Sequence, residues 1–231
     1  MNRLRITILF LVAAAFAVVT SAGESSPALP VAPILKNPPV LTAETLGGVR
    51  LLELSGARHF SAEETALVTG FIRSGGSLLV VIDEENRTPL FPDGSEALIE
   101  PFGLRFSADT PYLHNCGAIA RKGTVVGRDC ELPYSGGRAV EGGTPFAWRL
   151  DDKGEAAEVF AACAEVPGGG RIVALAEGMA YLGMGSPDGV RLSGVYRDPA
   201  HTTYWGKDSA AFMEEVRSWL LHGDCAAAAA K

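Results

Sequence analysis

Residues 50–85 read RLLELSGARHFSAEETALVTGFIRSGGSLLVVIDEE, and this stretch decides the fold that the sequence predicts. An apolar run is followed by an amphipathic helical pattern and then by a second, unbroken apolar run at residues 77–82. Ser61 and Glu64 have the spacing of a capping box, in which each side chain accepts a hydrogen bond from the other residue's backbone amide. The stretch therefore predicts a β-α-β unit with parallel strands, the second of them covered on both faces.

The chain before this unit has the composition of a leader and a tether. Arg3 and Arg5 precede an apolar stretch, residues 6–19, which small residues follow. This is the pattern of a secretory signal peptide, and it is shorter than the roughly 20 residues of a membrane span. We expect a signal peptide at residues 1–22, with an uncleaved anchor as the alternative. Residues 23–39 hold five of the 14 prolines and predict an extended tether.

The chain after this unit predicts short strands and a final helix. Residues 110–150 are rich in glycine and indicate a small antiparallel insertion. Residues 159–165 and 171–176 read as strands on either side of a tight glycine turn. A helix is expected from Asp208, a good N-cap residue. These patterns predict one domain over residues 40–223 and a disordered tail at 224–231.

The order of these segments resembles the class I glutamine amidotransferase-like superfamily. More narrowly, the chain resembles the non-catalytic branch of this superfamily, which includes uncharacterised exported bacterial domains and extracytoplasmic parts of gliding-associated transport proteins. A helix followed by two glycines and an apolar strand is typical of that branch, as are a late GGGRIVALAEG-like strand and a final helix ending in WL. The matching segments cover about half of the mature chain and are residues 46–56, 61–84, 99–106, 168–178 and 208–221.

The resemblance implies an α/β fold, a flavodoxin-like three-layer sandwich with a mostly parallel sheet. True glutaminases of the superfamily place a Cys after the strand matching residues 77–82 and a His-x-Glu pair after the strand matching 171–176. Here Asp83 or Glu84 stands at the first position, and residues 177–181, EGMAY, stand at the second. A carboxylate cannot replace the thiolate nucleophile of amide hydrolysis. The resemblance therefore implies a chain without glutaminase activity, and we predict no catalytic residue, cofactor or metal.

Ligands of open parallel sheets bind beyond the carboxyl ends of the strands. Asp83, Glu84 and Glu177 are expected to meet there, with Tyr181 and His201 flanking the same crevice. The functional interpretation is a small acidic ligand site. The alternative is a solvated acidic rim, or carboxylates that cap nearby backbone amides, with aromatic side chains that only pack the loops.

Four cysteines gain meaning if the chain is exported, because oxidising compartments favour disulfides. Cys116 and Cys130 lie in a segment that reads as neighbouring short strands, so we expect this pair to bridge. Free buried thiols are the alternative, and the sequence cannot choose among the three possible pairings.

A formal charge of −7 makes nucleic acid an unlikely class of partner. The main functional hypothesis is a secreted or periplasmic domain that binds a small ligand or an envelope protein without catalysis. One alternative is a hydrolase of carbohydrates or amides that uses Asp83, Glu177 and His201. Another is a structural subunit of an envelope complex. Contact with a membrane is expected only through an uncleaved signal anchor.

Overall fold

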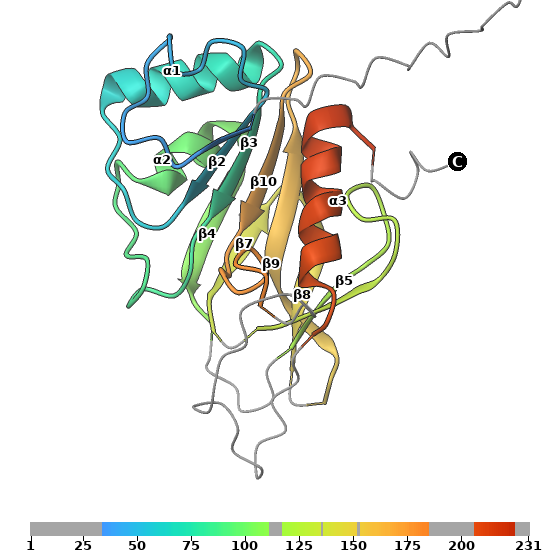
Figure 1. Ribbon diagram of the computed structural model, residues 1–231. Coiled ribbons are helices and arrows are strands. Elements are labelled where there is room, and N and C mark those ends of the chain that lie inside the picture. Colours follow the sequence, from blue (N-terminus) through green and yellow to red (C-terminus); the bar gives the residue numbers. More distant parts are fainter. Residues whose placement is uncertain (1–33, 111–116, 135, 152, 185–205, 225–231) are drawn as a thin grey trace, which may run out of the picture. The chain divides into compact units, whose positions relative to one another are not determined.

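The computed structural model describes residues 34–110, 117–134, 136–151, 153–184 and 206–224 (Figure 1). Their elements are β1 (Ile34–Lys36), β2 (Leu51–Ser55), α1 (Ala62–Arg73), β3 (Ser77–Val81), α2 (Ser95–Ile99), the 3-10 helix η1 (Glu100–Phe102), β4 (Leu104–Asp109), β5 (Ala118–Ala120), β6 (Cys130–Leu132), β7 (Arg138–Gly142), β8 (Thr144–Leu150), β9 (Ala156–Glu165), β10 (Arg171–Leu175) and α3 (Ser209–His222).

Eight strands form one mixed sheet in the order β1-β2-β3-β10-β9-β8-β5-β6, and β4 pairs with β7 in a second sheet. The pairs β1/β2, β2/β3 and β3/β10 are parallel. The pairs from β10 to β6 are antiparallel, as is β4/β7. The predicted β-α-β unit is therefore confirmed as β2, α1 and β3, and the predicted strand at residues 171–176 joins it in parallel.

The predicted flavodoxin-like, mostly parallel sandwich is wrong. The sheet is mostly antiparallel, and only three short α-helices occur in the described ranges. The difference lies between residues 104 and 165, for which the sequence predicts short strands, a small antiparallel insertion over residues 110–150 and a further strand at 159–165. These residues supply β5, β6, β8 and β9 to the main sheet, because β9 pairs with β10 across the tight turn that joins them. A tight turn can only connect antiparallel strands, so this half of the sheet needs no crossover helices.

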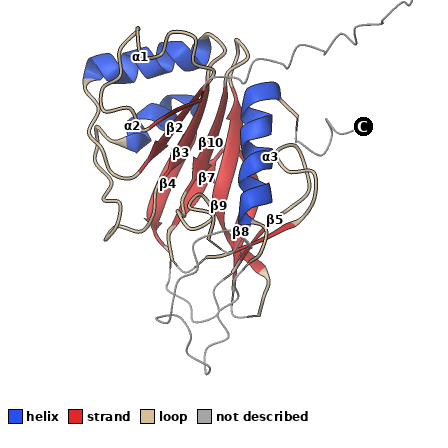
Figure 2. Ribbon diagram, in the orientation of Figure 1, coloured by secondary structure: helices blue, strands red, loops and turns tan. Residues whose placement is uncertain are grey.

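The central strands are buried on both faces. Leu78 belongs to the apolar cluster that includes Ile72 of α1, whereas Leu79 belongs to the cluster that includes Trp219 of α3. Figure 2 shows α1 and α2 on one side of the strands and α3 on the other. Successive side chains of a strand point to opposite faces, which explains why the run SLLVVI contains no exposed position.

Helix α1 begins as the sequence predicts. The Glu64 amide donates to Ser61 Oγ over 3.1 Å, and the Ser61 amide donates to Glu64 Oε2 over 3.1 Å. The start of α3 differs, because the Asp208 side chain makes no cap bond. Asp208 Oδ2 instead accepts from the Glu131 amide over 2.9 Å, and Glu131 O accepts from the Asp208 amide over 3.1 Å. Asp208 thus covers the outer edge of β6 rather than the end of its own helix.

The described part of the predicted tether lies in the sheet. Residues 34–36 form β1, which pairs with β2, and the Asn37 amide donates to Glu53 O over 2.9 Å. The predicted signal peptide and tail lie outside the described residues, except for Asp224. None of the helices in the described ranges has the length and apolar character that a bilayer-spanning helix requires.

The cysteines that the structure describes are free. Cys130 and Cys163 are both buried, and burial raises the pKa of each thiol to about 11. Cys116, the expected partner of Cys130, lies outside the described residues, as does Cys225. The Cys116–Cys130 bridge therefore stays a prediction, while the structure holds Cys130 as a buried thiol.

Candidate functional site

The two strand ends that were expected to carry acids lie side by side. Val81 of β3 is in parallel register with Leu175 of β10, so Asp83 and Glu177 follow at the same carboxyl edge. The Asp83 charge acts on the Glu177 carboxyl, and Asp83 Oδ2 would lie 3.3 Å from a Cβ added at Gly178. The structure thus brings Asp83 and Glu177 together, as the sequence predicts.

The carboxylates after β3 are already engaged by protein groups. Asp83 Oδ1 accepts from the Glu84 amide over 2.8 Å, and Asp83 Oδ2 pairs with Arg87 Nη1 over 3.1 Å. Glu84 Oε1 lies 3.2 Å from Arg87 Nε. One arginine four residues along the chain therefore compensates both carboxylates. This arrangement matches the alternative in which the acids bind nearby backbone amides. Their charges are balanced by Arg87 rather than by a ligand.

Arg138 of β7 fixes the same loop from inside the protein. The side chain is buried, donates to Asp83 O over 3.1 Å, and forms an ion pair with Glu85. It also donates to the backbone carbonyls of Thr88 and Ser107. Sequence reasoning missed Arg138, because nothing in the GGRAVEGG context distinguishes a buried arginine from an exposed one.

Glu177 is fully buried and caps a turn. Its Oε2 accepts from the Met179 amide over 2.9 Å and from the Ala180 amide over 3.4 Å, whereas Oε1 has no hydrogen-bond partner. Burial raises the pKa of Glu177 well above its usual range, and the Asp83 charge adds to the shift. A raised pKa favours the protonated form of the carboxyl group, which makes Glu177 a poorer cation ligand than an exposed carboxylate.

This environment predicts a pH dependence of stability. Because the folded-state pKa of Glu177 is raised, the native state holds a proton that the unfolded state loses above its ordinary pKa of about 4.5. Stability is therefore full below that value and falls as pH rises toward the folded pKa, by at most about 1.4 kcal/mol per pH unit. Glu177→Gln is expected to flatten this part of the profile, measured by urea unfolding between about pH 5 and pH 8. Glu165→Gln, at an exposed position on β9, serves as the control. Parallel profiles for wild type and Glu177→Gln contradict the prediction.

Tyr181 lies beside charged residues of β2 and α3. The half-buried Tyr181 ring lies 6.0 Å from the Arg217 guanidinium carbon. Burial raises the pKa of its hydroxyl, and the nearby Glu53 charge raises it further. Tyr181 thus borders an ion pair between β2 and α3. His201 lies outside the described residues. No group of three or more potential metal ligands occurs among the residues that the structure describes.

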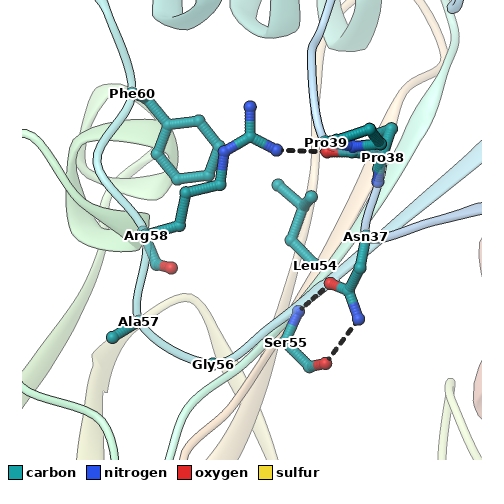
Figure 3. A pocket seen from close by; sticks show the side chains of 10 residues that line it. Asn37, Pro38, Pro39, Leu54, Ser55, Gly56, Ala57, Arg58 and Phe60 are labelled. Atoms are coloured by element: carbon teal, nitrogen blue, oxygen red, sulfur yellow. Dashed lines mark hydrogen bonds between the residues drawn. The ribbon is translucent and has the colours of Figure 1, made fainter.

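A crevice of about 350 Å³ opens beyond the carboxyl ends of β1 and β2 (Figure 3). Pockets of about 300–1,000 Å³ are typical of small-molecule sites, so this one suits a small ligand. Its walls come from the segments that follow β1 and β2 and from the start of α2. The lining residues are Asn37, Pro38, Pro39, Leu54, Ser55, Gly56, Ala57, Arg58, Phe60 and Ser95.

Asn37 closes one rim of the crevice. Its φ of 42° lies in the left-handed region, where asparagine is among the better tolerated residues. The Asn37 side chain turns toward Ser55: Nδ2 donates to Ser55 Oγ over 2.8 Å, and Oδ1 accepts from the Ser55 amide over 2.7 Å (Figure 3). These two bonds join the residues that follow β1 to the end of β2 and hold the rim in place.

Arg58 forms the opposite wall. Nη1 donates to Pro38 O, Nη2 pairs with Glu64 Oε1, and the guanidinium lies 4.7 Å from the centroid of the Phe60 ring. Figure 3 shows the guanidinium spanning the gap toward Pro38. The side chain is about one quarter exposed. Arg58 is thus held in one position while part of its guanidinium still reaches the solvent.

Ser95 lies deeper in the same crevice. The residue is only 7 % exposed, but its hydroxyl is not among the fully buried side-chain atoms that lack a hydrogen-bond partner, so it is available from the crevice. The preceding Gly94 lies close to the Arg58 backbone, because an added Cβ would meet Arg58 O at 3.3 Å. Sequence reasoning missed this crevice, since Asn37, Arg58 and Ser95 come from three separated segments with no shared motif.

A wider groove adjoins the crevice over α1 and shares Pro39 and Arg58 with it. At its edge His59 Nδ1 lies 2.8 Å from Asp93 Oδ1, and the imidazole stacks on Phe91 with ring centroids 4.1 Å apart. Asp93 accepts this bond, which lowers the pKa of its exposed carboxyl. The pair connects the loop before α1 to the loop before α2 and so supports the Ser95 side of the crevice.

No protein-family model matches the sequence, and no curated protein matches it. Among solved structures, the chain is similar to the mmIFT52 N-terminal domain, with a TM-score of 0.53, 17 % identity, and coverage of 80 % of this chain and 82 % of that chain. At this identity the similarity concerns the fold alone.

Weaker similarities involve β-galactosidases. Gan42B, a GH42 β-galactosidase from G. stearothermophilus, has a TM-score of 0.42 at 20 % identity, over 57 % of this chain and 19 % of that chain. A β-galactosidase from Rahnella sp. R3 has a TM-score of 0.43 at 15 % identity, over 57 % and 20 %. Both similarities are too low to support an argument. None of the matched structures named here is described as a glutamine amidotransferase.

Proposed function

We propose that this chain is an exported, non-catalytic domain of the cell envelope that binds a small polar ligand in the crevice beyond β2. The observation that carries the proposal is the crevice itself. It has the size of a small-molecule site, a rim held by paired hydrogen bonds, and a serine, Ser95, in its lining.

The acidic strand ends support binding rather than catalysis. Arg87 compensates Asp83 and Glu84, and Glu177 is buried, has a raised pKa and caps a turn. The positions at which the resembling glutaminases hold their Cys and His-x-Glu carry these acids instead. Neither position offers the thiol nucleophile or the His-x-Glu pair of those glutaminases, which supports a domain that binds without hydrolysing an amide.

The experiment is an NMR fragment screen on the mature chain, residues 23–231, uniformly labelled with nitrogen-15. We expect small polar fragments to shift the amide signals of crevice residues such as Ser55, Gly56 and Ser95. Ala57→Phe places a ring at the exposed rim and is expected to abolish these shifts. Ala157→Phe, at an exposed position on β9, is the matched control and is expected to retain them.

Two results would overturn the proposal. The first is a fragment screen in which shifts gather at Asp83 and Glu177, or in which no fragment shifts the crevice signals. The second is glutamine hydrolysis by the purified mature protein that disappears in Cys116→Ala. N-terminal sequencing of the protein recovered from its native envelope tests the export part, and an intact Met1 terminus contradicts cleavage of residues 1–22.

A further inference from the structure

The polar groups of the crevice are mainly hydrogen-bond donors. A guanidinium carries five N–H donors, and Arg58 uses one toward Pro38 O and one toward Glu64. The Asn37 amide nitrogen has two hydrogens, of which one goes to Ser55 Oγ. Ser95 adds a hydroxyl that is available from the crevice. A ligand that fills this crevice therefore needs acceptor oxygens close together.

The charge in the crevice limits the ligand further. Arg58 is a permanent cation, and the neighbouring Glu64 compensates it. Glu64 is already well satisfied: it accepts from the Ser61 and Leu41 amides, and the Ser61 bond is the main reason that its pKa is lowered. Because Arg58 and Glu64 already balance each other, a bound anion adds net negative charge beside Glu64, and a singly charged anion is repelled less than a multiply charged one.

We propose that the ligand is a small monocarboxylate whose two oxygens bind the free N–H groups of Arg58 and the Ser95 hydroxyl. A planar carboxylate matches the fork of a guanidinium, and bonds between two ions are the stronger class of hydrogen bond. The rest of the ligand lies against the apolar part of the lining, Pro38, Leu54 and Phe60. This inference rests on the proposed function, because it assigns a ligand class to the same crevice.

The contact between Arg58 and Glu64 makes a distinctive prediction about affinity. A bound carboxylate shares the guanidinium with Glu64, so the two anions repel each other. Glu64→Gln removes this charge and preserves the capping box, in which glutamine serves as well as glutamate. Glu64→Gln is therefore expected to strengthen carboxylate binding by about twofold or more, although Glu64 is not a ligand contact.

The experiment compares four monocarboxylates with their neutral amides by NMR titration of the labelled mature chain. The probes are acetate, glycolate, lactate and pyruvate, and acetamide, glycolamide, lactamide and pyruvamide. We expect at least one carboxylate to bind at the crevice about tenfold or more tightly than its amide, since hydrogen bonds to charged groups are worth about 1.5–3 kcal/mol.

Variants separate the roles of the crevice residues. Arg58→Gln is expected to weaken the best carboxylate about tenfold or more, and Ser95→Ala about twofold to tenfold. If Arg58→Gln disturbs the loop before α1, Ser95→Ala still tests the carboxylate contact without removing Arg58. Arg105→Gln is the matched control, because Arg105 is exposed on β4, pairs with Glu141, and does not line the crevice. It is expected to leave binding unchanged.

The outcomes distinguish this inference from the proposed function. Amides that bind the crevice as tightly as the carboxylates, or Glu64→Gln without any gain, contradict the carboxylate assignment and leave the ligand site standing. Carboxylates that bind elsewhere, while the crevice binds neutral fragments, also contradict the carboxylate assignment and leave the ligand site standing. If neither the probes nor any other fragment shifts the crevice signals, both proposals fail.

Discussion

Arg217→Met is expected to lower the free energy of unfolding by about 3 kcal/mol, the lower end of the range for breaking a buried ion pair. Arg217 of α3 binds Glu53 of β2 in a bidentate manner, with Nε–Oε1 at 2.6 Å and Nη2–Oε2 at 3.1 Å. Glu53 is fully buried and has no contact with water. Methionine keeps much of the aliphatic stem, so the loss reflects mainly the uncompensated carboxylate rather than lost packing.

Lys36 is the second cation near Glu53 and provides the control. Its Nζ lies 3.4 Å from Glu53 Oε2, but the side chain is about half exposed. Exposed partners contribute little, so Lys36→Met is expected to cost less than about 1 kcal/mol. Urea unfolding of both variants gives the free energy of unfolding extrapolated to water and the urea concentration at the midpoint. A cost below about 1 kcal/mol for Arg217→Met means that Lys36 or a local rearrangement satisfies Glu53.

A double variant tests the physical reason. Glu53→Leu combined with Arg217→Met replaces the buried pair with apolar side chains, a change that is often neutral or stabilising. We expect the double variant to be more stable than Arg217→Met alone. If it is less stable, packing of the arginine stem rather than the buried charge explains the loss.

Gly168→Ala is expected to destabilise the protein by about 3 kcal/mol or more, for two reasons that act together. Gly168 lies in the turn between β9 and β10 with φ of +107°, which a residue with a side chain rarely adopts. An added Cβ would also lie 2.2 Å from Arg73 O at the end of α1. Backbone rather than a flexible side chain blocks this space, so the turn or the helix must move.

Gly169→Ala separates the two contributions. Gly169 has φ of +93°, but nothing lies within 4 Å of an added Cβ. The expected loss is the conformational part alone, about 1–2 kcal/mol. Thermal and urea unfolding of the two variants measure the difference, which reports the contact between the turn and α1. Equal losses at both positions contradict a close contact at Gly168.

The fold was predictable where one segment contained the whole signal. Residues 50–85 hold two apolar strands, a capped helix and a glycine stop, and the structure confirms all of them as β2, α1 and β3. The arrangement of the later strands was not predicted, although part of the signal was present. The tight glycine turn at residues 168–170 requires antiparallel neighbours, and this turn joins the parallel and antiparallel halves of the sheet.

The candidate site divides in the same way. The meeting of Asp83 and Glu177 follows from strand register, and register follows from the apolar patterns of β3 and β10. The pairing of Asp83 and Glu84 with Arg87, and the support of the loop by Arg138, depend on side-chain positions that no local pattern specifies. His201 lies outside the described residues, so its expected place beside the acids stays a prediction.

The sequence by itself determined the β-α-β unit, the meeting of the acidic strand ends and the absence of a cysteine nucleophile there. Local hydrogen bonding, side-chain alternation and residue identity are enough for each of these. Only the tertiary structure decided which strands extend the sheet, and that Asn37, Arg58 and Ser95 line one crevice. Pairing between distant segments depends on which apolar surfaces bury together, and that free energy is shared by the whole domain rather than carried by any short stretch.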